Sequence, residues 1–162
     1  MTDAELTARA TAVLDACRKA KRMVATVESC TGGLVCGALT AIAGSSDVVE
    51  RGFVTYTNAA KTELVGVPED LLVAFGAVSE EVARAMAAGG IARSRADIAV
   101  AVTGIAGPGG ATPAKPVGLV HIAAARRDGA VEHERHVFPG DRDAVRRASV
   151  LAALAMVERL AR

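Results

Sequence analysis

Aromatic residues are scarce in this sequence. Its 162 residues include no Trp, one Tyr and three Phe, so aromatic side chains occupy 2% of positions. Proteins that bind single-stranded nucleic acid commonly stack the bases on aromatic side chains, and this chain has too few to build such a platform. The 19 basic and 18 acidic residues leave a net charge of +1, with no excess to follow a phosphate backbone. We therefore expect no nucleic-acid partner.

Long apolar runs and a secretory signal are also missing. No apolar run approaches the roughly 20 residues that a membrane span needs, and the acidic start at 1–5 lacks the basic and apolar pattern of a signal peptide. Cys17, Cys30 and Cys36 show no CxxC spacing, so neither a disulfide framework nor a structural zinc site is indicated. We expect a cytoplasmic protein with no membrane contact, no metal and no cofactor.

What the sequence does contain suits one folded domain over residues 1–162. Hydrophobic residues make up 51% and charged residues 23%, enough apolar surface to form a core. Apolar spacing predicts a first helix over 4–21, capped by Thr2 or Asp3, and a closing helix over 141–160. Strands are predicted at 23–27, 52–57, 97–102, 117–125 and 131–138.

Helical patterns follow several of these strands. We predict helices starting near residues 31, 59, 68 and 79, the last interrupted at its end by Gly89 and Gly90. The last two strands form a hairpin about Asp128–Gly129. The alternation of strands and helices predicts one α/β domain with a mixed sheet between helices.

The first candidate site is the predicted strand-to-helix turn over 28–33. Ser29 would lie on this turn, with the following backbone amides free to bind an oxyanion. Two alternatives stay open. Ser29 or Thr31 could simply cap the helix, and Cys30 is a rival nucleophile because such a turn exposes only one of two adjacent side chains well.

A second candidate pair crosses the next strand-to-helix junction. Tyr56, the only tyrosine, precedes Lys61 by five residues. A lysine can serve as the base for a serine if burial or a neighbouring cation lowers its pKa, and a tyrosine could relay the proton or hold the hydroxyl. The alternative is a tyrosine packed at a strand end and a solvated helix lysine.

The third candidate is the glycine-rich segment 103–110. Its amides could form an anion site, although it does not match the Walker pattern. Arg142 and Arg146 in the closing helix share a face because they are four residues apart, whereas Arg147 points elsewhere. These two arginines could complete a phosphate site or form a solvated helix face.

The histidines do not predict a metal site. His133 and His136 are three positions apart on a predicted strand, so their side chains would face opposite sides of the sheet.

Seven segments, in order along nearly the whole chain, together carry a family resemblance. They are Glu28–Gly33, Gly44–Ser46, Gly52–Lys61, Gly76–Ser79, Thr103–Pro108, Lys115–Gly118 and Gly140–Arg142. The sequence resembles the C-terminal domain of the CinA competence/damage-inducible family, the nicotinamide-nucleotide amidases, in its stand-alone form. The resemblance implies a three-layer α/β/α fold, no metal, and a nicotinamide nucleotide as the small-molecule substrate. The expected reaction is deamidation of nicotinamide mononucleotide to nicotinate mononucleotide and ammonia.

The resemblance also implies roles for individual residues. Ser29 becomes the nucleophile, Lys61 its general base, and Tyr56 a helper in proton transfer or hydroxyl positioning. The expected oxyanion and substrate-binding residues are Thr31, Gly32, Gly33, Ser46, Thr103, Gly104, Ala106, Gly107, Arg142 and Arg146. Among them, the amides near Gly32 and Gly33 are expected to stabilise the oxyanion. We also expect a homo-oligomer. A cysteine amidase using Cys30, and a non-catalytic nucleotide-binding or partner module linked to competence or DNA damage, remain as alternatives.

Overall fold

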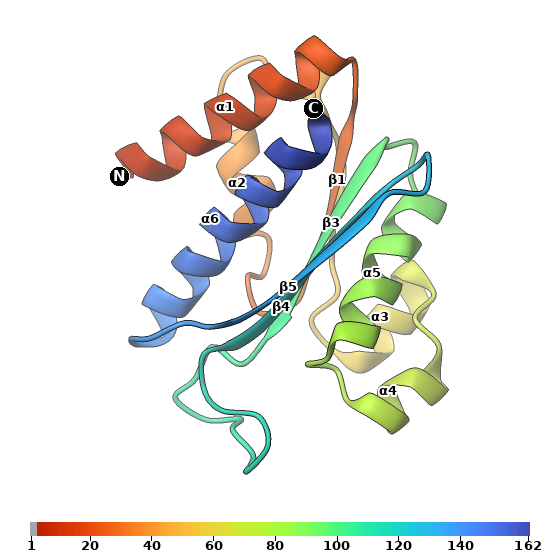
Figure 1. Ribbon diagram of the computed structural model, residues 1–162, viewed down its shortest axis with the longest axis vertical. Coiled ribbons are helices and arrows are strands. Elements are labelled where there is room, and N and C mark those ends of the chain that lie inside the picture. The colour runs from red at the N-terminus through yellow and green to blue at the C-terminus, as the bar shows by residue number, and fades with distance from the viewer. Residues whose placement is uncertain (1–2) are drawn as a thin grey trace.

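A five-stranded mixed sheet separates two layers of helices in the computed structural model, which describes residues 3–162 (Figure 1). The strands are β1 (Val24–Glu28), β2 (Val49–Val54), β3 (Ile98–Gly104), β4 (Leu119–Arg126) and β5 (Val131–Val137), in the order β2-β1-β3-β4-β5. β1 pairs in parallel with β2 and β3, whereas β3, β4 and β5 pair antiparallel. The predicted mixed sheet with its antiparallel hairpin is confirmed.

Helices cover both faces of this sheet, as Figure 1 shows. One layer contains α1 (Ala4–Ala20), α2 (Leu34–Thr40) and α6 (Arg142–Ala161). The other contains α3 (Asn58–Val65), α4 (Glu69–Phe75) and α5 (Glu80–Ala92). The fold is therefore the expected three-layer α/β/α sandwich. Within residues 3–162, no helix is both long and apolar enough to cross a bilayer.

The two faces of the sheet carry side chains of different size. On β3, Ile98, Val100 and Val102 belong to the core under α1, α2 and α6, whereas Ala99 and Ala101 face α5. Side chains alternate between the faces of a strand, so the large residues of β3 fill the core on one face of the sheet. The alanines on the other face let α5 approach the sheet closely.

Gly89 and Gly90 lie inside α5 and do not interrupt it, contrary to the sequence-based expectation. An added Cβ at Gly90 would lie 2.7 Å from Val27 Cγ2, and one at Gly89 would lie 1.8 Å from the carbonyl oxygen of Val65. The glycines are therefore where α5 meets the sheet and the end of α3. Their lack of a side chain permits this contact, and tertiary packing compensates for their low helix propensity.

Element boundaries also differ from prediction in two informative places. β2 begins at Val49 and ends at Val54, where 52–57 was expected, because the chain leaves the sheet early and Thr57 caps α3 through the amide of Ala60. α2 starts at Leu34, because residues 29–33 form a turn. Asp3 caps α1, as predicted; the other candidate cap, Thr2, lies outside the described residues.

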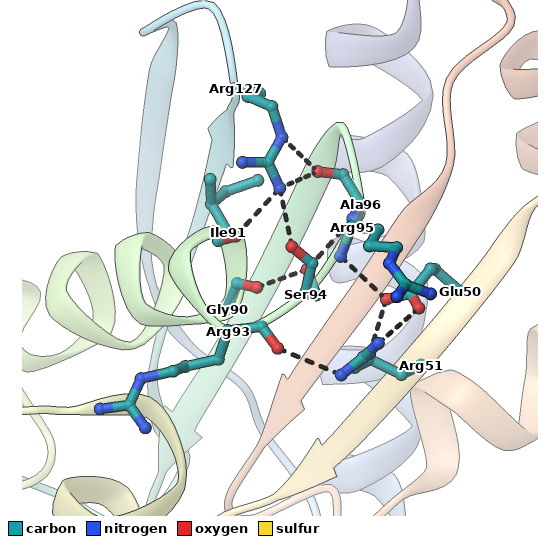
Figure 2. A network of polar contacts seen from close by, with 9 residues as sticks. All are labelled: Glu50, Arg51, Gly90, Ile91, Arg93, Ser94, Arg95, Ala96 and Arg127. Carbon is teal, nitrogen blue, oxygen red and sulfur yellow. Dashed lines mark hydrogen bonds and ion pairs between the residues drawn. The ribbon is translucent and has the colours of Figure 1, made fainter.

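A polar network closes the end of the molecule where β1 and β3 begin (Figure 2). The Arg127 guanidinium donates to the carbonyl oxygens of Ile91, Ser94 and Ala96 at 3.0, 3.0 and 2.7 Å. Carbonyls at and beyond a helix C-terminus lack intrahelical donors and carry partial negative charge, so Arg127 stabilises the end of α5. Nearby, Glu50 accepts hydrogen bonds from the Arg51 guanidinium and the Arg95 amide.

The close contact at Gly89 makes a stability prediction. Gly89→Ala places a methyl group against the Val65 carbonyl, so we expect the free energy of unfolding to fall by at least about 2 kcal/mol. Gly37→Ala is the matched control, because Gly37 is also in a helix and nothing lies within 4 Å of its added Cβ. That variant should gain about 0.5–1 kcal/mol from helix propensity. Urea unfolding measures both, and equal midpoints would contradict the close contact.

Candidate active site

The candidate site lies where the parallel strands β1 and β3 end. Ser29 follows β1 directly, and its amide donates to the Val102 carbonyl of β3 at 2.9 Å. The Thr55 amide, just beyond β2, donates to the Glu28 carbonyl at 2.8 Å. The segment carrying Ser29 is therefore anchored to both neighbouring strands. Carboxyl ends of parallel strands are the usual ligand-binding edge of α/β sheets.

Lys61, on α3, extends to this edge of the sheet and is buried. Its side chain is 1% exposed, and its Nζ lies 3.1 Å from Ser29 Oγ. The Nζ also donates to the carbonyls of Thr55 at 3.0 Å and Tyr56 at 3.4 Å. Those two carbonyls are available because β2 ends at Val54. The alternative of a solvated helix lysine is wrong.

The electrostatics of Lys61 favour loss of its proton. Removal from water lowers the pKa of the amine below its ordinary value of 10.5. Among residues 3–162, no carboxylate forms an ion pair with Lys61 that would oppose this effect. A neutral amine beside a hydroxyl is the arrangement in which lysine can act as a general base.

Neither Ser29 nor Thr31 caps α2, so this alternative is also wrong. The N-cap is Gly33, which has no side chain, and the carboxylate of Glu28 instead accepts from the amides of Val35 and Cys36 at 2.8 and 3.0 Å. Glu28 belongs to the first of the sequence motifs, but no role was predicted for it. No spacing pattern identifies this capping, because it depends on where the folded turn places the Glu28 side chain.

The amides of the turn divide into occupied and available groups. The Gly32 amide was expected to bind the oxyanion, but it donates to the Ser29 carbonyl at 3.0 Å and is not free. Within the described part of the chain, the amides of Cys30, Thr31 and Gly33 have no hydrogen-bond acceptor. Thr31 is 0% exposed, so neither its side chain nor its amide is accessible to a ligand.

Cys30 is a poorer nucleophile candidate than its neighbour. Its side chain is buried, and burial raises the pKa of the thiol to about 11. The Lys61 amine contacts Ser29 Oγ. The geometry therefore favours Ser29, a choice that the sequence left open.

Arg142, at the start of α6, contacts both the glycine-rich loop and Tyr56. Tyr56 is 57% exposed, and its phenol oxygen accepts from Arg142 Nη2 at 3.1 Å. Arg142 Nη1 donates to the Gly107 carbonyl at 2.9 Å. The contact between Tyr56 and the Ser29–Lys61 pair is made by the tyrosine backbone carbonyl, while the phenol is bound to Arg142.

The remaining loop residues predicted for substrate binding are largely occupied. Thr103 Oγ1 donates to the Ala77 carbonyl at 2.8 Å, and Ala106 is buried in the core. A Cβ at Gly104 would lie 2.7 Å from Val120 Cγ2, which shows how closely these strands pack there. Thr103, Ala106 and Gly107 are therefore buried within the fold, and the exposed residues of this segment are at 108–110.

Two other predicted residues do not join this group as free side chains. Arg146 shares the Arg142 face of α6, but its Nε donates to the Cys30 carbonyl at 3.1 Å. Ser46 lies in the short 3-10 helix Ser45–Asp47, which precedes β2 and so belongs to the opposite end of the sheet. Arg147 points away, as predicted, and pairs with Asp3.

The histidines lie outside this site. His121 Nδ1 is 2.9 Å from His133 Nε2, and His133 lies near Glu80 of α5. His136 stacks on Phe138, which packs against the core of the other layer. Among residues 3–162, no group of three or more His, Cys, Asp or Glu side chains could hold a metal ion.

The fold and site define an α/β/α domain with a serine beside a buried lysine. A family model described as the CinA C-terminal domain matches residues 6–161, and the chain belongs to this family. The resemblance that the sequence motifs indicated is thereby confirmed.

Individual relatives extend this comparison. The Escherichia coli K12 protein named nicotinamide-nucleotide amidohydrolase PncC is 49% identical over 154 residues, which cover 95% of this chain and 93% of that protein. A CinA-like protein of Akkermansia muciniphila is 54% identical over 131 residues, covering 81% of this chain and 32% of that protein. The chain spans about a third of the length of such longer curated relatives.

A solved structure agrees closely with this fold. The crystal structure of the competence/damage inducible protein CihA from Agrobacterium tumefaciens has a TM-score of 0.97 to this chain at 49% identity. The match covers 100% of this chain and 99% of that one.

The raised thiol pKa of Cys30 makes a labelling prediction. A shift from 9.0 to about 11 leaves about one-hundredth of the ordinary thiolate at pH 8, so native Cys30 should react about 100-fold more slowly with iodoacetamide than an exposed thiol. Mass spectrometry of native and urea-unfolded protein measures this. Rapid native labelling at Cys30 would show that the thiol is accessible and ionised, and would reopen the cysteine alternative.

Proposed function

We propose that this protein is a nicotinamide-nucleotide amidase that hydrolyses the carboxamide of nicotinamide mononucleotide, giving nicotinate mononucleotide and ammonia. The observation that carries the proposal is the buried Lys61 amine 3.1 Å from Ser29 Oγ. The likeness to E. coli PncC over nearly the full length of both chains supports the substrate class.

The first half-reaction forms an acyl-enzyme. Neutral Lys61 accepts the Ser29 hydroxyl proton while Oγ bonds to the carboxamide carbon, and the carbonyl electron pair moves to oxygen. Among the amides without an acceptor, those of Cys30 and Gly33 are the available donors for that oxyanion, because Thr31 is 0% exposed. When the intermediate collapses, the C–N bond breaks, Lys61 returns its proton to nitrogen, and ammonia leaves.

In the second half-reaction water is the nucleophile and Ser29 is the leaving group. Lys61 takes a proton from water as the water oxygen bonds to the acyl carbon. Collapse then breaks the ester bond, and Ser29 Oγ recovers the proton. The products are free Ser29 and the carboxylate of nicotinate mononucleotide, so no oxidant, reductant or metal is consumed.

Arg142 is the side chain best placed to hold the 5′-phosphate. It is exposed at the start of α6 and donates to the Gly107 carbonyl. A guanidinium matches the paired oxygens of a phosphate. The exposed Tyr56 offers the pyridine an aromatic side chain, which a chain without Trp can supply in few other ways.

The serine mechanism makes a direct activity prediction. Ser29→Ala should lower kcat for ammonia release from nicotinamide mononucleotide by at least about 10³-fold, because the acyl-enzyme cannot form. Cys30→Ala is the matched control at the neighbouring position and should keep most of the activity. Full activity in Ser29→Ala would overturn the mechanism. Tight binding of the nucleotide by wild-type protein without turnover would instead favour the non-catalytic module.

The pH profile follows from the lowered pKa of Lys61. Below that pKa the amine is protonated and cannot accept the Ser29 proton, so kcat should rise as pH increases through it. The plateau should be reached below 10.5, the ordinary lysine value. Lys61→Arg keeps the positive charge but cannot lose its proton, so it should stay inactive across this range. A flat wild-type profile from pH 6 to about 10 would argue against Lys61 as the base.

A further inference from the structure

One buried carboxylate joins the two ends of the turn that carries Ser29. Glu28 is the last residue of β1 and is 1% exposed. Its Oε1 accepts from the Val35 amide at 2.8 Å and its Oε2 from the Cys36 amide at 3.0 Å. The residue immediately before Ser29 is therefore bonded to the first turn of the helix after it.

This connection replaces the usual capping arrangement. The first amides of a helix need acceptors, which an N-cap side chain normally supplies. Gly33 supplies none, so α2 depends on a group from the far side of the turn. The strand end itself is fixed, because the Ser29 amide and the Glu28 carbonyl are bonded to the neighbouring strands. Glu28 thereby sets where α2 begins relative to Ser29.

Arg146 acts on the same turn from α6. Its Nε donates to the Cys30 carbonyl at 3.1 Å and its Nη2 approaches the Thr31 carbonyl at 3.5 Å. By holding these two carbonyls, Arg146 fixes the backbone of the turn between the Cys30 and Gly33 amides, which have no acceptor within residues 3–162.

We propose that Glu28 is a positioning residue for the Ser29 reaction, and that Arg146 supports the same turn instead of binding the nucleotide. The inference rests on the proposed amidase function. Donors aimed at a developing oxyanion accelerate a reaction because they need no rearrangement when it occurs. Glu28 and Arg146 fix the distance between Ser29 Oγ and the acceptor-free amides of the turn, and neither side chain touches the substrate.

Glu28→Gln tests this role with little change in side-chain volume. The amide nitrogen cannot accept a hydrogen bond, so either the Val35 or the Cys36 amide loses its acceptor. We expect kcat to fall about 100-fold, the effect of a small misplacement of reacting groups, while KM changes less than about threefold. Faster hydrogen exchange at the Val35 and Cys36 amides should accompany the loss.

Asp3→Asn is the matched control. The Asp3 carboxylate also accepts from two amides at a helix N-terminus, those of Glu5 and Leu6, but on α1 and away from Ser29. This variant should keep the wild-type kcat and KM. Equal losses of kcat in both variants, or wild-type kcat in Glu28→Gln despite faster exchange at its two amides, would overturn the proposal.

A second variant covers the case in which Glu28→Gln does not fold. Arg146→Gln should lower kcat with KM nearly unchanged, whereas a raised KM with unchanged kcat would show that Arg146 binds the nucleotide and would overturn its assignment. If wild-type protein releases no ammonia, the proposed function fails by itself. The rate at which a fluorophosphonate labels Ser29 then replaces kcat as the readout, with at least a tenfold lower rate in either variant expected and an unchanged rate contradicting the inference.

Discussion

The arrangement of the site depends on a lysine amine held out of water without a carboxylate partner. Burying an ionisable amine disfavours its charged form, and a carboxylate beside it would restore that charge. Among residues 3–162, the hydrogen-bond partners of Lys61 Nζ are one serine hydroxyl and two backbone carbonyls. These partners satisfy the hydrogens of the amine, and burial away from any ion-paired carboxylate of residues 3–162 lowers its pKa.

The buried carboxylate of Glu28 does not pair with Lys61, because it is bonded to the start of α2. Glu28 adjoins Ser29 in sequence, yet both of its oxygens are occupied by α2 amides. A helix N-terminus carries partial positive charge, so the carboxylate is stabilised there without pairing with Lys61. The Glu28 carboxylate therefore faces a helix end, whereas the Lys61 amine faces the Ser29 hydroxyl.

Sequence patterns predicted the layers and missed the local details. Strand and helix periodicity located all five strands and the main helices, because the buried faces of this domain follow regular spacing. The end of β2 was misplaced because Phe53 to Thr57 favour strand by composition, whereas the carbonyls of Thr55 and Tyr56 are used by Lys61. Capping by Glu28 could not be predicted from spacing, because it depends on where a folded turn places a side chain from the preceding strand.

Candidate residues were similarly divided. The proximity of Ser29 and Lys61 was predicted from motifs on adjacent strand-to-helix junctions, and the structure brings the two together. The choice between Ser29 and Cys30 required side-chain direction, which the sequence does not contain. Arg146 was grouped with Arg142 because helix spacing gives a shared face but not the partner that each guanidinium finds.

The contact between Gly89 of α5 and the end of α3 limits which amino acids can occupy position 89. Val65, whose carbonyl faces Gly89, lies one helical turn after Lys61 on α3. A side chain at position 89 would push the end of α3 and shift the lysine amine relative to the serine. Residue 89 contacts neither Ser29 nor Lys61, yet substitutions there are limited by the need to keep these two side chains aligned. Amino-acid changes in the contact between α5 and α3 therefore affect the reaction at the edge of the sheet.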